Sequence, residues 1–178
     1  MIPGEWDAQR AVAAAPLLRF EGTVWRTHWK ELNATDWSRS LETSGRYNRG
    51  RDLYPDDAWP ALYTSLDAET AVWEMVRRSL TRNPRFLTNQ VLSEIAVGPI
   101  EVLDARDPVA LNLTLADLTG TTMTITQDLA QAASGHGYQG LLVPSAAILG
   151  RHNLTILPAN LSELSALRVV SSVDLHLE

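Results

Sequence analysis

The chain has 178 residues, a formal net charge of −6 and no cysteine. A chain of this length favours one domain, because a core of this size buries roughly two thirds of the surface that the unfolded chain exposes. The lack of cysteine excludes disulfides and thiolate metal sites, and the negative charge disfavours general attraction to nucleic acid. We therefore expect residues 1–178 to form a single domain without a direct nucleic-acid partner.

No signal for a membrane or for export stands out in the sequence. No stretch approaches the ~18 apolar residues that a membrane-spanning helix needs. Glu5 and Asp7 lie where a secretory signal would place positive charge. We expect a cytoplasmic protein with no membrane partner, which also fits the absence of cysteine.

The first sixty residues contain two predicted elements and a long connection. Ala-rich periodicity predicts a helix within residues 5–18 that Pro16 ends, and the alternation of GTVWRTHW predicts a strand over residues 22–29. Residues 30–60 are rich in small polar and aromatic side chains and lack a regular period. Long connections in compact domains often carry function, so we look for a site there.

The next elements are a short strand and the most regular helix of the sequence. Residues 61–65 predict the strand, and Asp67 is placed to cap a helix over residues 67–80, with arginines near its negative C-terminal end. Pro84 indicates that this helix has ended. On a helical wheel Glu74 lies opposite the apolar face, where a glutamate ordinarily forms a weak surface pair with an arginine three or four residues along.

The second half of the chain predicts strands around one short helix. The elements are a strand over 91–97, a turn at Gly98-Pro99, a strand over 100–104, a helix over 127–134 capped by Thr126 and stopped by Gly135, strands over 140–144 and 153–158, and a C-terminal strand in which Val173, Leu175 and Leu177 alternate. The turn would make the first two strands a hairpin. Because helices and strands lack a regular βαβ rhythm, the sequence favours the α+β class.

The segment Gly135-His136-Gly137-Tyr138-Gln139-Gly140 matches the dinucleotide fingerprint GxGxxG. That fingerprint follows a strand and opens a helix, so that the helix N-terminus faces the pyrophosphate. Here a predicted helix ends and an apolar strand begins. We therefore interpret the segment as a helix stop followed by a tight turn.

Arginine makes up 14 of the 15 basic residues, and its planar fork suits phosphate and carboxylate groups. A GC-rich coding bias would account for the preference for arginine over lysine in the whole chain. The local clustering of Arg46, Arg49 and Arg51 in SGRYNRGRD is the more informative feature. Arg26 lies among aromatic residues in VWRTHW. If Arg26 is shielded from water it needs a phosphate or a carboxylate nearby, and its spacing alone does not choose between them.

Metal and hydrolase sites find little support in the sequence. The four histidines are scattered and no HExxH motif accompanies them. Ser145 in VPSAAILG lacks a GxSxG elbow, so a catalytic triad is not indicated, and the local pattern is also typical of a serine that caps the following turn.

Taken together, four fragments in order resemble the RES domain, named for an arginine, a glutamate and a serine. The match runs from about residue 23 to residue 157. The fragments are VWRTH with Arg26, GRYNRG with Arg46, Tyr47 and Asn48, ALYTSLDAETAVWE with Tyr63 and Glu74, and GYQGLLVPSAAILGRHNLTIL with Ser145. The N-terminal helix, Trp25, the Asp-rich insert around residues 54–59 and the C-terminal extension depart from the family pattern.

The resemblance implies an α+β fold like that of ADP-ribosyltransferases, with a split pair of small antiparallel or mixed sheets and helices around an NAD+ cleft. It implies an NAD+ glycohydrolase or NAD+ phosphorylase, which cleaves the nicotinamide–ribose bond with water or phosphate as acceptor. NAD+ would be the substrate, phosphate a co-substrate in the second case, and neither a cofactor nor a metal would be needed. Family members are toxins, so a neutralising antitoxin of the Xre helix-turn-helix type is the expected partner.

The resemblance also implies residue roles. Arg26, Glu74 and Ser145 would be catalytic, with Glu74 facing the positive charge that develops on the ribose. Arg26 and Arg46 would hold the pyrophosphate. The expected NAD+-binding set is Arg26, Arg46, Tyr47, Asn48 and Tyr63, in which the tyrosines stack on nicotinamide or bond a ribose hydroxyl; Ser145 would bond the ribose or orient Glu74.

Three alternatives remain open at this point. The same cleft would serve transfer of ADP-ribose to a macromolecule. A catalytically silent module would use Arg26 and Glu74 as a structural ion pair and only bind a partner. A ribonuclease is less attractive, given the acidic charge and the lack of a paired histidine site. Self-association is also left open.

Overall fold

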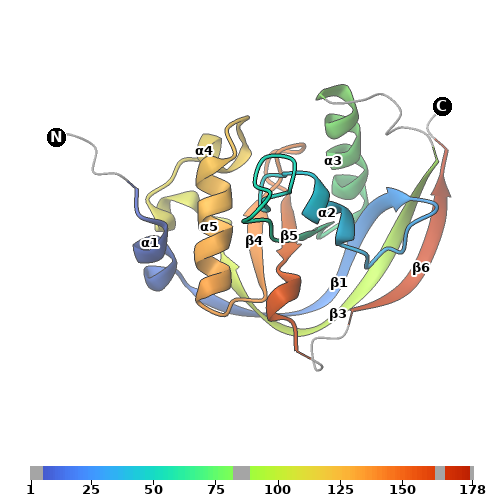
Figure 1. Ribbon diagram of the computed structural model, residues 1–178. Coiled ribbons are helices and arrows are strands. Elements are labelled where there is room, and N and C mark those ends of the chain that lie inside the picture. Colours follow the sequence, from blue (N-terminus) through green and yellow to red (C-terminus); the bar gives the residue numbers. More distant parts are fainter. Residues whose placement is uncertain (1–5, 82–88, 163–166, 177–178) are drawn as a thin grey trace.

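A single curved sheet organises the fold. The computed structural model describes residues 6–81, 89–162 and 167–176. Figure 1 shows β4 and β5 in the middle of the molecule and the long strands β1, β3 and β6 curving past them. Helices α1 and α5 lie on one side of the molecule, and helix α3 lies on the opposite side. The helices and strands are mixed along the chain, so the predicted α+β class is confirmed.

The strands close into a ring. Their order is β1-β2-β5-β4-β3-β6, and β1 also pairs with β3, so that β6 alone lies outside the ring of described strands. The β3–β4 pair is parallel, and the other pairs are antiparallel. The strand bounds are β1 Leu17–Trp29, β2 Leu62–Ser65, β3 Gln90–Asp104, β4 Gly140–Pro144, β5 His152–Ile156 and β6 Leu167–Leu175.

The helices cover the ring from two sides. Their bounds are α1 Ala8–Ala14, α2 Ser38–Glu42, α3 Ala68–Thr81, α4 Leu115–Thr119 and α5 Thr124–Gly135, with 3-10 turns at Pro108–Leu111 and Pro158–Asn160. The helix predicted over 67–80 is confirmed, and the Asp67 carboxylate accepts the Thr70 amide at 2.9 Å as its N-cap. Pro84 lies outside the described residues. None of the described helices is long and apolar enough to cross a membrane.

Two helix predictions need correction. The first helix, Ala8–Ala14, stops before Pro16 as predicted, but the range of residues 5–18 is too long, because Leu17 and Leu18 belong to β1, where they pair with Leu103 and Val102. The helix predicted to start after Thr126 begins at Thr124. The Thr126 hydroxyl bonds back to the carbonyl of Met123 at 2.9 Å, so it lies inside the first turn and does not cap it.

The hairpin predicted at Gly98-Pro99 is wrong, because β3 runs through both residues. Proline lacks an N–H, so a strand tolerates it only where no neighbour needs that donor. On one edge of β3, the pairing with β6 stops at Val97, which lies opposite Leu167, and the pairing with β4 starts at Val102. On the other edge β1 has a bulge between Phe20 and Gly22. The dipeptide therefore lies between two partners of one long strand.

The GxGxxG segment has the predicted role of a stop and a turn. Helix α5 ends at Gly135, Gly137 has a φ of +85°, and β4 begins at Gly140. A positive φ is readily adopted only by glycine, which explains the residue type at position 137. The C-terminal strand is confirmed as β6, although Leu177 lies outside the described residues.

Candidate functional site

The carboxylate of Glu74 is held by three donors at one of its oxygens. Glu74 lies in the second turn of α3, and its Oε1 accepts the Ser145 hydroxyl at 2.7 Å, the Ala146 amide at 3.0 Å and the Asn153 side-chain amide at 2.7 Å. Within the described part of the chain no donor binds Oε2. Glu74 is therefore half-buried against the β4–β5 loop instead of solvated on the helix surface, and one oxygen is left for a ligand.

Ser145 both shapes its loop and holds Glu74. Its buried hydroxyl donates to Glu74 and accepts the amides of Ala147 and Ile148, each at 3.1 Å. Its own amide donates to the carbonyl of Arg151 at 2.8 Å, which closes the loop between β4 and β5. Both readings of the sequence therefore hold, since Ser145 caps the turn and orients the glutamate.

A tight turn presents Arg46 and is held from outside by a tyrosine. The Tyr63 hydroxyl on β2 accepts the Tyr47 amide at 2.8 Å and donates to Asn48 Oδ1 at 2.7 Å. Gln127 on α5 donates to the carbonyls of Gly45 and Asn48. The polar groups of Tyr63 and Asn48 thus hold the protein's own turn, a role that the sequence did not indicate.

Two arginines meet beside Glu74. Arg46 donates to the carbonyls of Leu118 and Thr119 at 3.2 and 3.3 Å, and Arg77 reaches the same Thr119 carbonyl at 3.4 Å. Burial lowers the pKa of Arg46, and the positive charge of Arg77 lowers it further while Glu74 opposes that change. Arg46 therefore shares one electrostatic site with Glu74. Arg77 was seen in the sequence only as a surface partner for the glutamate.

Arg26 lies on β1 and interacts with the charge of Arg78 on α3. Its Nη1 donates to the carbonyls of Ala34 and Asp36, both at 2.7 Å, so it organises the loop that follows β1. Its pKa is lowered to about 10, chiefly by burial and also by the charge of Arg78, while the charge of Asp36 opposes this change. Glu74, Arg77 and Arg78 are three and four residues apart and share one face of α3. That face connects the Arg46 side of the site to the Arg26 side.

Tyr47 is, with Asn48, one of the two fully buried residues of the predicted ligand-binding set. Its side chain is 3% exposed, its ring centroid lies 6.5 Å from that of Tyr63, and its hydroxyl has no partner among the described residues. Burial raises the pKa of the Tyr47 hydroxyl. The charge of Arg46 lowers it, and the charge of Glu74 raises it. The structure thus brings Arg46, Tyr47, Tyr63, Glu74 and Ser145 together, with Arg26 beside Arg78 at the far end of the face.

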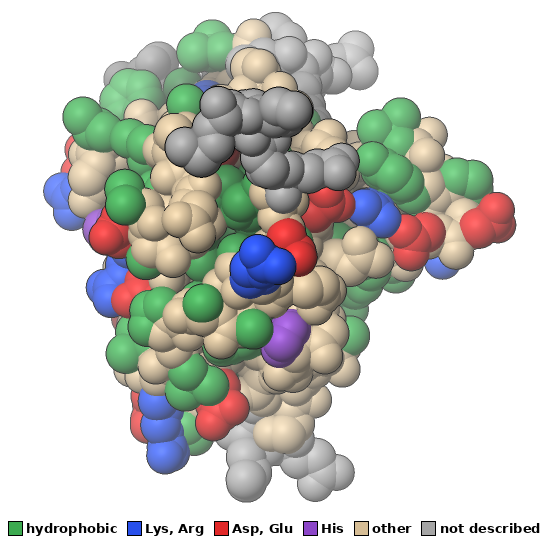
Figure 2. All heavy atoms as spheres, turned by 90° about the vertical axis from the view of Figure 1, so that its left-hand side faces the viewer, with side chains coloured by type: hydrophobic (Ala, Val, Ile, Leu, Met, Phe, Trp, Pro, Cys, Tyr) green, Lys and Arg blue, Asp and Glu red, His purple; other side chains and the backbone are tan. Residues whose placement is uncertain are grey.

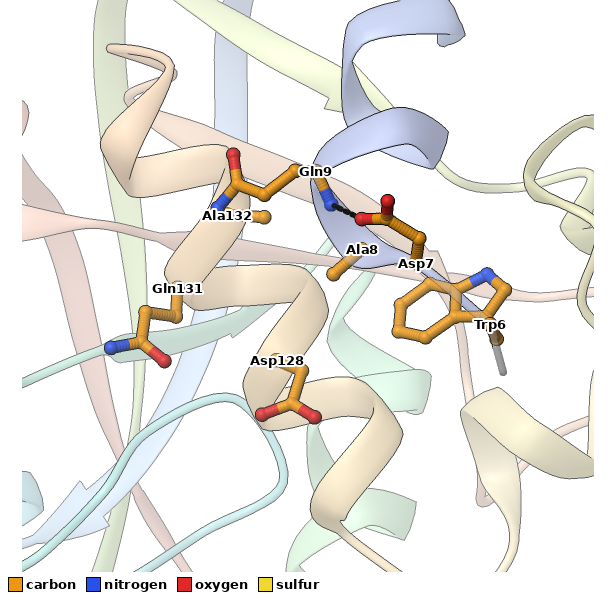
Figure 3. A pocket seen from close by; sticks show the side chains of 7 residues that line it. All are labelled: Trp6, Asp7, Ala8, Gln9, Asp128, Gln131 and Ala132. Atoms are coloured by element: carbon orange, nitrogen blue, oxygen red, sulfur yellow. Dashed lines mark hydrogen bonds between the residues drawn. The ribbon is translucent and has the colours of Figure 1, made fainter. Parts of the chain in front are cut away.

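A separate hollow of about 450 Å³ lies between α1 and α5 (Figure 3). Asp7 and Asp128 line it from the two helices, and no basic side chain does, so it offers nothing that attracts phosphate. On the face that carries α1, Figure 2 shows acidic and basic side chains interspersed. Among the described residues no group of three His, Cys, Asp or Glu side chains gathers as a metal site would.

Comparisons with known proteins identify the family and the fold. The RES domain family matches residues 23–178. A chain in the crystal structure of the M. tuberculosis MbcT–MbcA toxin–antitoxin complex is 23% identical, with a TM-score of 0.81 over 96% of this chain and 94% of that chain. A search of curated proteins found no match. The structural likeness extends to the N-terminal residues that the family match leaves out.

Proposed function

Since the chain belongs to the RES domain family, we propose that it is a toxin-type enzyme that cleaves the bond between nicotinamide and ribose in NAD+. The observation that carries the proposal is the carboxylate of Glu74. Three donors fix its Oε1, no donor among the described residues binds Oε2, and the charge of Glu74 acts on Arg46, which shares the Thr119 carbonyl with Arg77. A preorganised negative charge of this kind stabilises a cation that forms only in the transition state.

The reaction balances without a metal or a cofactor. The nicotinamide nitrogen takes the bonding electron pair and leaves as neutral nicotinamide, and the positive charge remains on the ribose. Glu74 stabilises that charge while water or phosphate attacks the same carbon. The products are nicotinamide with ADP-ribose and a proton, or nicotinamide with phosphorylated ADP-ribose. NAD+ is consumed as substrate in both cases.

The diphosphate of NAD+ would be held by the arginines along α3. Arg26 interacts with the charge of Arg78, and Arg46 interacts with the charge of Arg77, so two pairs of like charges lie close together, and Arg26 and Arg46 are the partly buried members nearest the sheet and the turn. Bringing guanidinium groups together in this way is costly, and a dianionic ligand offsets the cost. Their role is to position the glycosidic bond beside Glu74.

A partner protein is part of the proposal. The similar chain of known structure comes from a toxin–antitoxin complex, and free NAD+ cleavage would harm the cell that makes the enzyme. We infer a cognate antitoxin, of the Xre helix-turn-helix type that the family resemblance implies. Co-purification with the product of an adjacent gene for such a protein tests this inference.

A time course of NAD+ loss, with and without phosphate and with products identified by mass, tests the activity. Glu74→Gln should lower kcat by about 100-fold or more, because the amide keeps the shape and loses the charge. Glu69→Gln, an exposed change on the same helix, should leave kcat unchanged. Unchanged turnover in Glu74→Gln contradicts the role of this carboxylate. If NAD+ labelled in its ADP-ribose part transfers that label to macromolecules, the activity is ADP-ribosyl transfer. If NAD+ stays intact, the protein is a binding module.

A further inference from the structure

Strand β5, in addition to the β4–β5 loop, contacts the carboxylate of Glu74. Asn153 lies in β5, directly opposite Ser65 of β2 in the register of the sheet. The Ser65 hydroxyl donates to Asn153 Oδ1 at 2.7 Å, and Asn153 Nδ2 donates to Glu74 Oε1 at 2.7 Å. Ser65 is buried, so this chain of hydrogen bonds runs from the sheet interior to the carboxylate.

The chemistry of the three groups determines which way the Asn153 amide points. An ionised carboxylate only accepts hydrogen bonds, so the amide must turn its Nδ2 toward Glu74. Its Oδ1 then faces Ser65, whose hydroxyl rotates freely and donates to it. The reversed amide would place two acceptors in contact at 2.7 Å. Glu74 therefore selects the orientation of the amide, and Ser65 holds the amide in place by donating to its Oδ1.

We propose that Asn153 is a positioning residue for the cleavage of NAD+, and that Ser65 fixes its side-chain amide. The proposal rests on the function proposed above. Ser145 and Ala146 hold Oε1 from the loop, and Asn153 holds the same oxygen from a strand of the ring. Donors from two independent elements fix both the place and the rotation of the carboxylate, so that Oε2 keeps its direction toward the ribose.

Two substitutions at Asn153 distinguish the loss of its hydrogen-bond donor from the loss of side-chain volume. In Asn153→Ala the donor is lost, and in Asn153→Asp an acceptor of the same shape replaces it beside Oε1. A hydrogen bond to a charged group is worth about 1.5–3 kcal/mol, so both variants should lose roughly tenfold or more in kcat at neutral pH while KM changes little. As the pH falls, the new carboxyl group of Asn153→Asp regains a proton to donate, so its kcat should recover relative to that of Asn153→Ala.

The control is a matched asparagine away from the site. Asn160 donates its Nδ2 to the carbonyls of Ser134 and Tyr138, so Asn160→Asp also removes side-chain donors from a half-buried asparagine. It should lower stability and leave kcat unchanged. Equal losses of kcat in Asn160→Asp and Asn153→Asp, or wild-type kcat in both Asn153 variants, would overturn the proposal.

A readout without substrate distinguishes this inference from the proposed function. In the NMR spectrum of the substrate-free protein, a proton of the Asn153 side-chain amide should lie downfield because it bonds a carboxylate. Glu74→Ala should move that signal upfield, and Glu69→Ala should not. A signal that stays in place shows that the contact is absent, whether or not the protein consumes NAD+. A shift together with intact NAD+ keeps the contact and contradicts only the activity.

Discussion

The space around Gly45 shows how closely the Arg46 turn is packed. A Cβ at Gly45 would lie 2.5 Å from Asn48 Oδ1 and 2.6 Å from Tyr63 Oη. The Tyr63 hydroxyl donates a hydrogen bond to Asn48 Oδ1 and accepts one from the Tyr47 amide. Neither atom moves without weakening a bond that holds the turn. The residue next to the phosphate-binding candidate must therefore lack a side chain.

Gly45→Ala should lower the free energy of unfolding by about 1–3 kcal/mol, the usual cost of inserting a methyl group into a packed site. It should also raise KM for NAD+, because Arg46 shifts with the turn. Chemical denaturation and steady-state kinetics measure the two effects. Gly135→Ala, where no atom lies within 4 Å of the added Cβ, is the control, and an equal loss of stability there would argue against crowding at Gly45.

At the scale of elements, a chain of polar contacts links the buried side chains of His28 and Ser93 to Ser172 of β6. His28 Nδ1 lies 2.9 Å from the carbonyl of Trp29, its Nε2 lies 2.8 Å from Ser93 Oγ, and Ser93 Oγ lies 2.6 Å from Ser172 on β6. A carbonyl only accepts, so the neutral ring carries its proton on Nδ1 and accepts the Ser93 hydroxyl at Nε2. Burial lowers the pKa of His28, which favours this neutral form.

This lowered pKa predicts a loss of stability in mild acid. Below the ordinary histidine pKa of about 6.5 the unfolded chain binds a proton that the folded protein resists, so the free energy of unfolding falls as the pH drops through that value. The contribution of His28 is fully present above it. His28→Gln should reduce the difference between urea denaturation at pH 7.5 and at pH 5.5. The exposed His136→Gln serves as control, and an unchanged difference in His28→Gln would exclude His28 as the source.

At the scale of the whole molecule, β4 separates two apolar clusters. Leu141 packs with α1, α4 and α5 in one cluster, and Leu142 packs with the other ring strands in the second. Successive side chains of a strand point to opposite faces, so one strand serves both cores. The Glu74 site lies just beyond the end of β4, and its loop therefore depends on both clusters.

Leu141→Ala and Leu142→Ala should each lower the free energy of unfolding by about 2–5 kcal/mol, because each side chain is almost fully buried and leaves a cavity. Since both clusters share β4, each variant should still unfold in one transition. Denaturation followed by tryptophan fluorescence and by far-UV circular dichroism measures this. Curves that separate in either variant would mean that the clusters unfold independently.

Local sequence determined much of the framework, whereas Glu74 stood out only through the family resemblance. Asp67 and the periodicity after it predict α3, the apolar run at 140–144 predicts β4, and the order of motifs singles out Glu74 and Ser145. These features depend on neighbours along the chain. Caps, periodicity and short motifs act within one or two turns, so they are legible before any tertiary contact forms.

Only the tertiary structure decided what surrounds that acid. The continuity of β3 through Gly98-Pro99 depends on where β6 ends and β4 begins, and the role of Asn153 depends on the register of β5 against β2. Asn153 is one of three polar residues in β5, whose sequence is HNLTI, and nothing near it in the chain indicates a carboxylate. Ring closure brings α3 over β5, and contacts between residues so distant in sequence are set by packing of the whole domain.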